Sequence, residues 1–160
     1  MPKKQKTGEQ GKTLLLDSSA ILNDFSFEFT PGVKYFMVPE AVSEIRDLRS
    51  RALLENGFAQ RALSVREPSA GALEKAQEKA RSLGVRLSSA DLALVALAID
   101  FREAKERFEA VTDDYSLQNV LKALNLPFSG IIHGEIKAVK NFKEQYEKAR
   151  KRAENGQKTD

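Results

Sequence analysis

The sequence of 160 residues contains no cysteine, no tryptophan and a single histidine, His133. Without cysteine, neither a disulfide framework nor a zinc site built from thiolates can form, and a reducing compartment is compatible with the chain. One histidine cannot supply paired imidazole ligands, and any Ser-His-Asp triad would depend on it alone. These absences leave carboxylates, hydroxyls and basic side chains as the groups available for chemistry.

Long apolar runs are missing too. The runs present are far shorter than a membrane-spanning helix needs, and the N-terminus lacks the hydrophobic segment of a secretory signal. Hydrophobic residues make up 41% of the chain and charged residues 31%, a balance typical of globular domains. We therefore expect one soluble, cytoplasmic domain with its own core and no membrane partner.

Positive charge is concentrated in two segments of the chain. Residues 1–12 carry a net charge of +3 and residues 137–160 carry +4, which leaves −4 for residues 13–136 because the total is +3. This pattern favours a polyanionic partner held by the basic segments, although segments that serve only solubility remain an alternative. We expect a basic N-terminal tail (1–12), a folded domain (13–136) and a basic C-terminal helix and tail (137–160).

Short apolar runs alternate with helical patterns along the chain. The strand-like runs lie at 13–16, 33–38, 63–67, 107–112 and 127–132, and helical spacing follows at 18–23, 39–58, 68–84, 88–106, 113–126 and 136–156. Strands that alternate with helices indicate βαβ units. The predicted fold is therefore α/β, with three layers in which helices flank a central parallel sheet.

Acidic residues stand at the places where predicted strands end. Asp17 directly follows the first strand, Asp113 and Asp114 follow the strand at 107–112, Glu44 lies in the helix after the second strand, and Asp91 begins the most apolar helix. Parallel strands end at one edge of a sheet, so these carboxylates should converge there. A divalent Mg²⁺ or Mn²⁺ ion would supply the counter-charge, and it can activate water in phosphodiester cleavage.

Each of these acids also has a purely structural interpretation. Asp91 completes an S-x-x-D capping box, and one of Asp113 and Asp114 can cap the helix that follows. Glu44 can pair with a basic side chain on an exposed helix face. Asp17 is different, because nothing in a strand end requires a carboxylate. The convergence of the set, rather than any single member, predicts a catalytic centre.

Four segments occur in the order and spacing of a PIN-domain nuclease. They are "LLLDSSAIL", "MVPEAVSEIRDLRSRALL", "LSSADLALVALAID" and "AVTDDYSLQNVLKAL". The runs "VSEIRDLRSR" and "TDDYSLQNV" together resemble the archaeal Nob endonucleases, which cut precursor small-subunit ribosomal RNA at its mature 3′ end. The resemblance covers about residues 13–136 and implies a PIN fold and a Mg²⁺- or Mn²⁺-dependent endoribonuclease that acts on single-stranded RNA of the pre-ribosomal particle.

The resemblance also implies roles for individual residues. The acids that would bind metal and carry catalysis are Asp17, Glu44, Asp91 and Asp114, with Asp113 as a further metal ligand. The hydroxyls that would orient these acids or water are those of Ser18, Ser19 and Thr112. Nob proteins usually carry a cysteine-rich zinc ribbon that holds RNA. The present sequence contains no cysteine and so no counterpart of this ribbon. The predicted RNA contacts in the basic helix are Lys137, Lys140, Lys143 and Arg150.

Two other functions stay open on the sequence. One is a toxin-type PIN ribonuclease of the VapC kind, which keeps the chemistry but changes the target. The other is a PIN module without catalysis that binds RNA as an assembly factor. A haloacid-type phosphatase is disfavoured because Ser19 occupies the place of its second aspartate. A homodimer also remains open.

Overall fold

A five-stranded parallel sheet forms the centre of the protein. The computed structural model describes residues 11–23, 26–132 and 135–157. The strands are β1 (Thr13–Leu16), β2 (Lys34–Met37), β3 (Leu63–Val65), β4 (Glu109–Val111) and β5 (Phe128–Ser129), in the order β3-β2-β1-β4-β5. Every pairing within this sheet is parallel, so the predicted α/β fold is confirmed.

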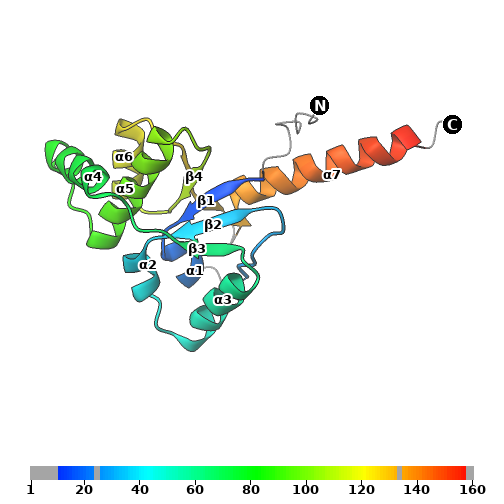
Figure 1. The fold of residues 1–160 in the computed structure, drawn as a ribbon, viewed down its shortest axis with the longest axis horizontal. Helices are drawn as coiled ribbons and strands as arrows, with labels where there is room; N and C mark the ends of the chain where they lie inside the picture. Colours follow the sequence, from blue (N-terminus) through cyan, green and yellow to red (C-terminus); the bar gives the residue numbers. More distant parts are fainter. Residues whose placement is uncertain (1–10, 24–25, 133–134, 158–160) are drawn as a thin grey trace, which may run out of the picture.

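Helices cover both faces of this sheet. They are α1 (Ser19–Leu22), α2 (Pro39–Ser43), α3 (Leu48–Ala59), α4 (Ala70–Ser82), α5 (Ser89–Glu103) and α6 (Tyr115–Ala123). Figure 1 shows α1, α2 and α3 gathered on one side of the strands and α4, α5 and α6 on the other. The residues 93–99 of α5 are all buried, and so are Leu14, Leu15 and Leu16 of β1. A helix and a strand that are apolar all round are expected at the centre of a three-layer core.

The strand order places a topological switch point beside β1. The chain moves from β1 outward to β2 and β3, and then returns to the other side of β1 to add β4 and β5. Leu16 at the end of β1 pairs with Val111 at the end of β4, so the two carboxyl ends lie level. Ligand sites of open parallel sheets lie at such a point, beyond the carboxyl ends of the strands.

The single helix predicted over 39–58 is two helices in the structure. Residues 44–47 separate α2 from α3, and the Asp47 carboxylate accepts a hydrogen bond of 2.9 Å from the Ser50 backbone N–H at the start of α3. This hydrogen bond lowers the pKa of the Asp47 carboxyl. The capping aspartate therefore starts a new helix within a pattern whose apolar spacing is continuous.

The predicted last strand over 127–132 is also divided. Its first part is β5, whereas β6 (Ile131–Ile132) pairs antiparallel with β7 (Glu135–Ile136) in a separate sheet. The basic helix α7 (Lys137–Gln157) follows, and Figure 1 shows it running away from the body of the protein. His133 lies outside the described residues. No helix in the described part of the chain is long and apolar enough to cross a membrane.

Aromatic side chains pack together on the α3 side of the sheet. The ring of Phe29 lies edge-on to those of Phe27 and Tyr35, with centroid distances of 5.0 and 5.1 Å. Gly57 of α3 lies against this cluster, and a Cβ atom built on it would lie 2.6 Å from Phe29 Cζ. Because Phe29 is held by two other rings, it has little room to move away.

We expect Gly57→Ala to destabilise the protein by about 1–3 kcal/mol, because it overpacks the aromatic cluster. Gly71→Ala is the matched control, since nothing lies within 4 Å of a Cβ atom built at this position of α4. The control should be neutral or stabilising by up to about 1 kcal/mol. Urea unfolding of the two variants measures both changes, and equal stability of the two would contradict the close contact at Gly57.

Candidate active site

Asp17 lies at the centre of the switch point. Its backbone N–H donates to Val111 O at 3.1 Å, which extends the pairing of β1 and β4 by one bond. Its side chain is only 8% exposed. The carboxylate oxygen Oδ2 accepts hydrogen bonds from Thr112 Oγ1 at 2.9 Å and Ser19 Oγ at 3.0 Å. The hydroxyls of Ser19 and Thr112 therefore hold this carboxylate in one orientation.

Glu44 is joined to this centre through Ser18. The Ser18 Oγ atom donates to Glu44 Oε2 at 2.6 Å, and it lies 3.4 Å from Asp17 Oδ1. Glu44 is exposed and follows the last residue of α2, so the break between α2 and α3 falls at this acid. Ser18 thus links two carboxylates that are far apart in sequence.

Asp114 both caps a helix and faces the same edge. Its Oδ1 atom accepts hydrogen bonds from the backbone N–H groups of Ser116 at 2.8 Å and Leu117 at 3.2 Å, at the start of α6. Its own N–H donates to Thr112 Oγ1 at 3.1 Å. Thr112 therefore connects the backbone of Asp114 with the carboxylate of Asp17. The capping interpretation of Asp114 is confirmed, and only one carboxylate oxygen serves it.

Asp91 lies in the first turn of α5 and is half-buried. Its backbone N–H donates to Ser88 Oγ at 3.1 Å, which confirms the predicted cap. Burial raises the pKa of the Asp91 carboxyl, and the negative charges of Asp17 and Asp114 raise it further, against the lowering effect of the Ser88 hydrogen bond. Acids from β1, α5 and the end of β4 are thus close enough to repel one another.

Asp113 has a different environment from its neighbour. Its Oδ1 atom accepts a 2.7 Å hydrogen bond from the Ile131 N–H, and a Cβ atom built at Gly130 would lie 3.1 Å from the same oxygen. Asp113 is not among the charges that shift the pKa of Asp91. In this structure Asp113 anchors the segment between β5 and β6, a contact that the sequence did not suggest.

Two further side chains at this edge were not predicted. Gln118 Nε2 donates to the backbone oxygen of Thr112 at 2.8 Å and so supports the turn that holds Asp114. Glu40 lies one helical turn before Glu44, and its Oε2 atom is buried without a hydrogen-bond partner. The spacing of four residues between the two glutamates was the available signal for Glu40.

The acids at this edge have no basic partner among the described residues. In the part of the chain that the structure describes, no ion pair joins Asp17, Glu44, Asp91 or Asp114 to a lysine or arginine. Within the same residues, no three acidic or histidine side chains are close enough to enclose a metal ion by themselves. The donors available are all oxygen atoms, which suit a hard cation that keeps part of its water shell.

Residues 14–101 match the model of a family described as the PIN domain of ribonuclease. The chain belongs to the PIN-domain ribonuclease family. The matched region includes Asp17, Glu44 and Asp91, whereas Thr112 and Asp114 follow it. The predicted resemblance is therefore confirmed.

The chain is also similar in sequence to individual ribonucleases. The chain is 31% identical over 125 residues to endoribonuclease Nob1 of Methanothermobacter thermautotrophicus. This alignment covers 77% of this chain and 71% of the relative. It is 34% identical over 129 residues to endoribonuclease Nob1 of Pyrococcus abyssi, covering 79% and 73%. It is also 46% identical over 90 residues to ribonuclease VapC3 of Aeropyrum pernix, covering 55% and 65%.

The fold is also similar to a crystal structure of VapBC2 from Rickettsia felis bound to a DNA fragment from their promoter. The TM-score is 0.50 at 12% sequence identity, and the match covers 74% of this chain and 98% of the other. At this level of identity the likeness concerns the fold, which agrees with the PIN architecture.

Thr112→Val should destabilise the protein by about 1–3 kcal/mol, because it keeps the shape of a fully buried side chain but removes the hydroxyl shared by Asp17 and Asp114. Thr112→Ser keeps the hydroxyl and should recover most of that loss. Urea unfolding in EDTA compares the two. A valine variant as stable as the wild type would mean that the hydroxyl network does not hold Asp17.

Asp91→Asn should stabilise the metal-free protein at neutral pH. A carboxyl whose pKa is raised on folding penalises the folded state once it ionises, and this penalty is absent below the ordinary pKa of an aspartate. The gain in Tm should therefore disappear as the pH falls below the carboxyl range. Thermal unfolding in EDTA from acidic to neutral pH measures it, and a gain that is constant with pH would exclude the charge explanation.

Proposed function

We propose that this PIN domain is an endoribonuclease that hydrolyses phosphodiester bonds of single-stranded RNA with the help of a divalent cation. The observation that carries the proposal is the buried carboxylate of Asp17, which accepts hydrogen bonds but has no basic partner among the described residues. A buried charge without a counter-charge is costly, so a cation at this edge would supply the positive charge that the described residues do not.

The donors fit Mg²⁺ or Mn²⁺ as the cation. Asp17, Glu44, Asp91 and Asp114 would hold it, with Asp113 and Glu40 as acids at the border of the site. Mg²⁺ commonly uses one or two carboxylates and keeps several waters, so an open set of acids is suitable. When bound, such an ion activates water and stabilises the charge that develops on phosphate oxygens. Ser18, Ser19 and Thr112 hold the acids in place beforehand.

The proposed substrate is precursor small-subunit ribosomal RNA near its 3′ end. The support is the name endoribonuclease Nob1 carried by relatives that this chain matches over most of its length. An unpaired strand can bend its phosphate into a recessed edge, whereas a duplex cannot. Tyr115 supports the same substrate class, because its ring is 82% exposed directly after Asp114 and is available for stacking on a base.

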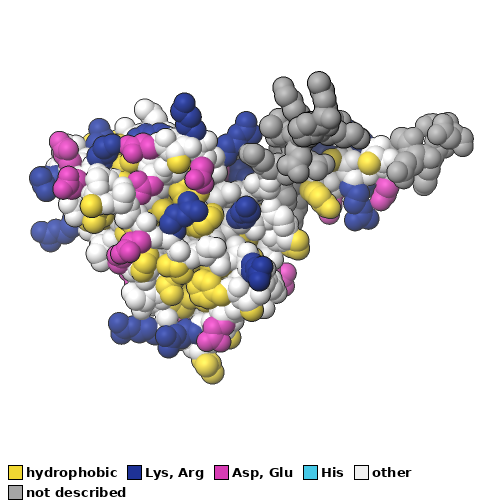
Figure 2. Space-filling view, in the orientation of Figure 1, with side chains coloured by type: hydrophobic (Ala, Val, Ile, Leu, Met, Phe, Trp, Pro, Cys, Tyr) yellow, Lys and Arg dark blue, Asp and Glu magenta, His cyan; other side chains and the backbone are white. Residues whose placement is uncertain are grey.

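Basic side chains outside the acidic edge would hold the rest of the RNA. Figure 2 shows lysine and arginine side chains at the outer edges over α3 and α4 and on the coloured stretch of α7. In α7, Arg150 is exposed and forms an ion pair of 3.2 Å with Glu154. The structure describes the backbone of Lys137, Lys140 and Lys143 but not their side chains, so their role stays a prediction. Exposed pairs such as the one at Arg150 are weak and open readily to a phosphate.

Cleavage of a single-stranded RNA that spans a small-subunit 3′ end, in Mn²⁺ or in EDTA, tests this function. We expect cleavage in Mn²⁺ that EDTA abolishes. Asp17→Asn and Glu44→Gln each remove one ligand charge and keep the shape, and each should lower the cleavage rate by at least about 100-fold. Glu55→Gln changes an exposed glutamate of α3 in the same way and is the matched control.

The outcomes separate the candidate functions. Cuts at the mature 3′ end that vanish in Asp17→Asn support ribosomal RNA processing. Cuts elsewhere that also vanish in that variant support a VapC-type ribonuclease instead, the candidate that the match to VapC3 favours. RNA binding without cleavage in any divalent metal would leave the non-catalytic assembly factor.

A further inference from the structure

A hollow lies between α4 and α5, beside the first turn that carries Asp91. It is shallow and open to solvent, with a volume of about 410 Å³. It is lined by Gln77, Ala80 and Arg81 of α4, by the loop residues Gly84, Val85, Arg86 and Leu87, and by Leu92 of α5. Leu92 is the residue after Asp91, so the hollow reaches the first turn of α5.

The local sequence builds this hollow into the backbone. Gly84 adopts a φ angle of +66°, in the left-handed region that glycine tolerates, directly after the end of α4. The N–H of Val85 donates to Ala80 O at 2.9 Å, and the chain then crosses to Ser88, which caps α5. Hydrogen bonds therefore fix both ends of the loop that lines the hollow.

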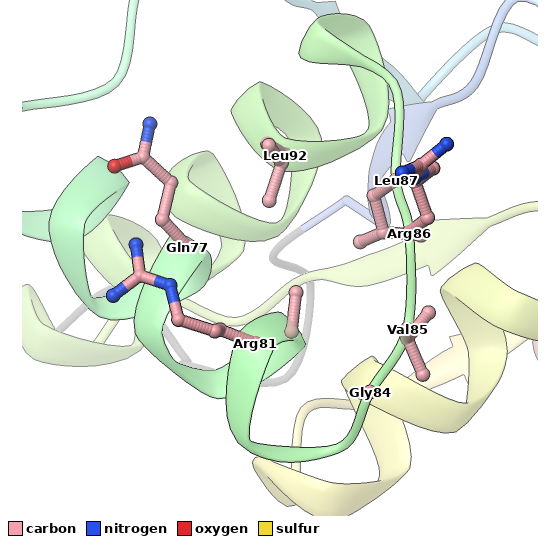
Figure 3. A pocket seen from close by; sticks show the side chains of 8 residues that line it. Gln77, Arg81, Gly84, Val85, Arg86, Leu87 and Leu92 are labelled. Carbon is pink, nitrogen blue, oxygen red and sulfur yellow. The ribbon is translucent and has the colours of Figure 1, made fainter.

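The chemistry of the lining combines an apolar floor with two cations. Leu87 and Leu92 point into the space, while Arg81 projects from α4 on one side and Arg86 from the loop on the other (Figure 3). Both arginines are exposed, and within the described residues neither forms an ion pair. The lining contains no aspartate or glutamate, although residues 13–136 carry a net charge of −4.

We propose that this hollow binds one nucleotide of the RNA strand that flanks the scissile phosphate. The base would lie against Leu87 and Leu92, and Arg81 and Arg86 would contact the phosphates on either side of it. Guanidinium groups bind phosphate through paired hydrogen bonds, and an apolar floor accepts a base of any identity. The inference rests on the proposed function, because the strand must also reach the acids beside Asp91.

The double variant Arg81→Gln/Arg86→Gln tests this site, with Arg107→Gln as the control. Arg107 is an exposed arginine without an ion pair in the described residues, and it precedes β4, at the opposite edge of the sheet from the acids. Binding of the same single-stranded RNA is measured in EDTA, where nothing is cut, over a series of salt concentrations. Loss of two phosphate contacts should reduce the slope of log Kd against log salt by about 1.4.

Cleavage kinetics in Mn²⁺ complete the test. We expect KM to rise on the order of 10-fold in the double variant with kcat little changed, and an unchanged Tm, because both arginines are exposed. An unchanged slope and KM, or an equal change in Arg107→Gln, would overturn the site while leaving a nuclease that still cuts RNA. Absence of cleavage by the wild type would instead count against the proposed function, and the salt slope would still report on the hollow.

Discussion

The burial of one carboxylate at the end of the central strand constrains the rest of this protein. Asp17 is nearly excluded from water, and the hydroxyls around it supply hydrogen bonds without supplying charge. Such an arrangement costs stability in the absence of a cation, since carboxylates nearby add repulsion. This constraint explains why the hydroxyls of Ser19 and Thr112 surround Asp17. They are the groups that can hold a buried carboxylate in position and leave its charge available.

The sheet order explains how acids so distant in sequence meet. Asp17 and Thr112 follow neighbouring strands, β1 and β4, whose ends lie level at the switch point. Glu44 comes from the helix after β2, on the other side of β1, and Asp91 comes from α5, which covers the opposite face. No single loop builds the site. A change in the strand order would separate the acids even if every residue were kept.

The sequence was sufficient to predict the features of the fold that repeat along the chain. The alternation of strands and helices predicted the parallel sheet, and parallel strands made the convergence of Asp17 and Asp114 a geometric consequence. It was insufficient where local and periodic signals disagreed. The apolar spacing continued from Val42 through Ile45 to Leu48, yet Asp47 caps a new helix and leaves Leu48 almost fully exposed.

Other misses came from contacts between distant segments. The hydrogen bond from Ile131 to Asp113 cannot be inferred from either position alone, so the paired aspartates looked equivalent in the sequence although only Asp114 acts on Asp91. The division of 127–132 has the same cause, because Ile131 and Ile132 pair with β7 rather than with the main sheet. The hollow beside α5 likewise depends on a three-dimensional approach of α4 and a loop.

The remaining physical problem is how a polyanion approaches an acidic edge. Charges separated by more than about 8–10 Å are largely screened at physiological ionic strength, so distant basic residues cannot offset the repulsion at the scissile phosphate itself. A bound cation can do so at the centre, whereas Arg81 and Arg86 line the hollow that Leu92, the residue after Asp91, also lines. Under the proposed function, the helix α7, which runs away from the body, would contact phosphates farther along the strand and speed the encounter. Attraction at the flanks and neutralisation at the centre are therefore separate tasks, and in this protein separate groups are positioned for each.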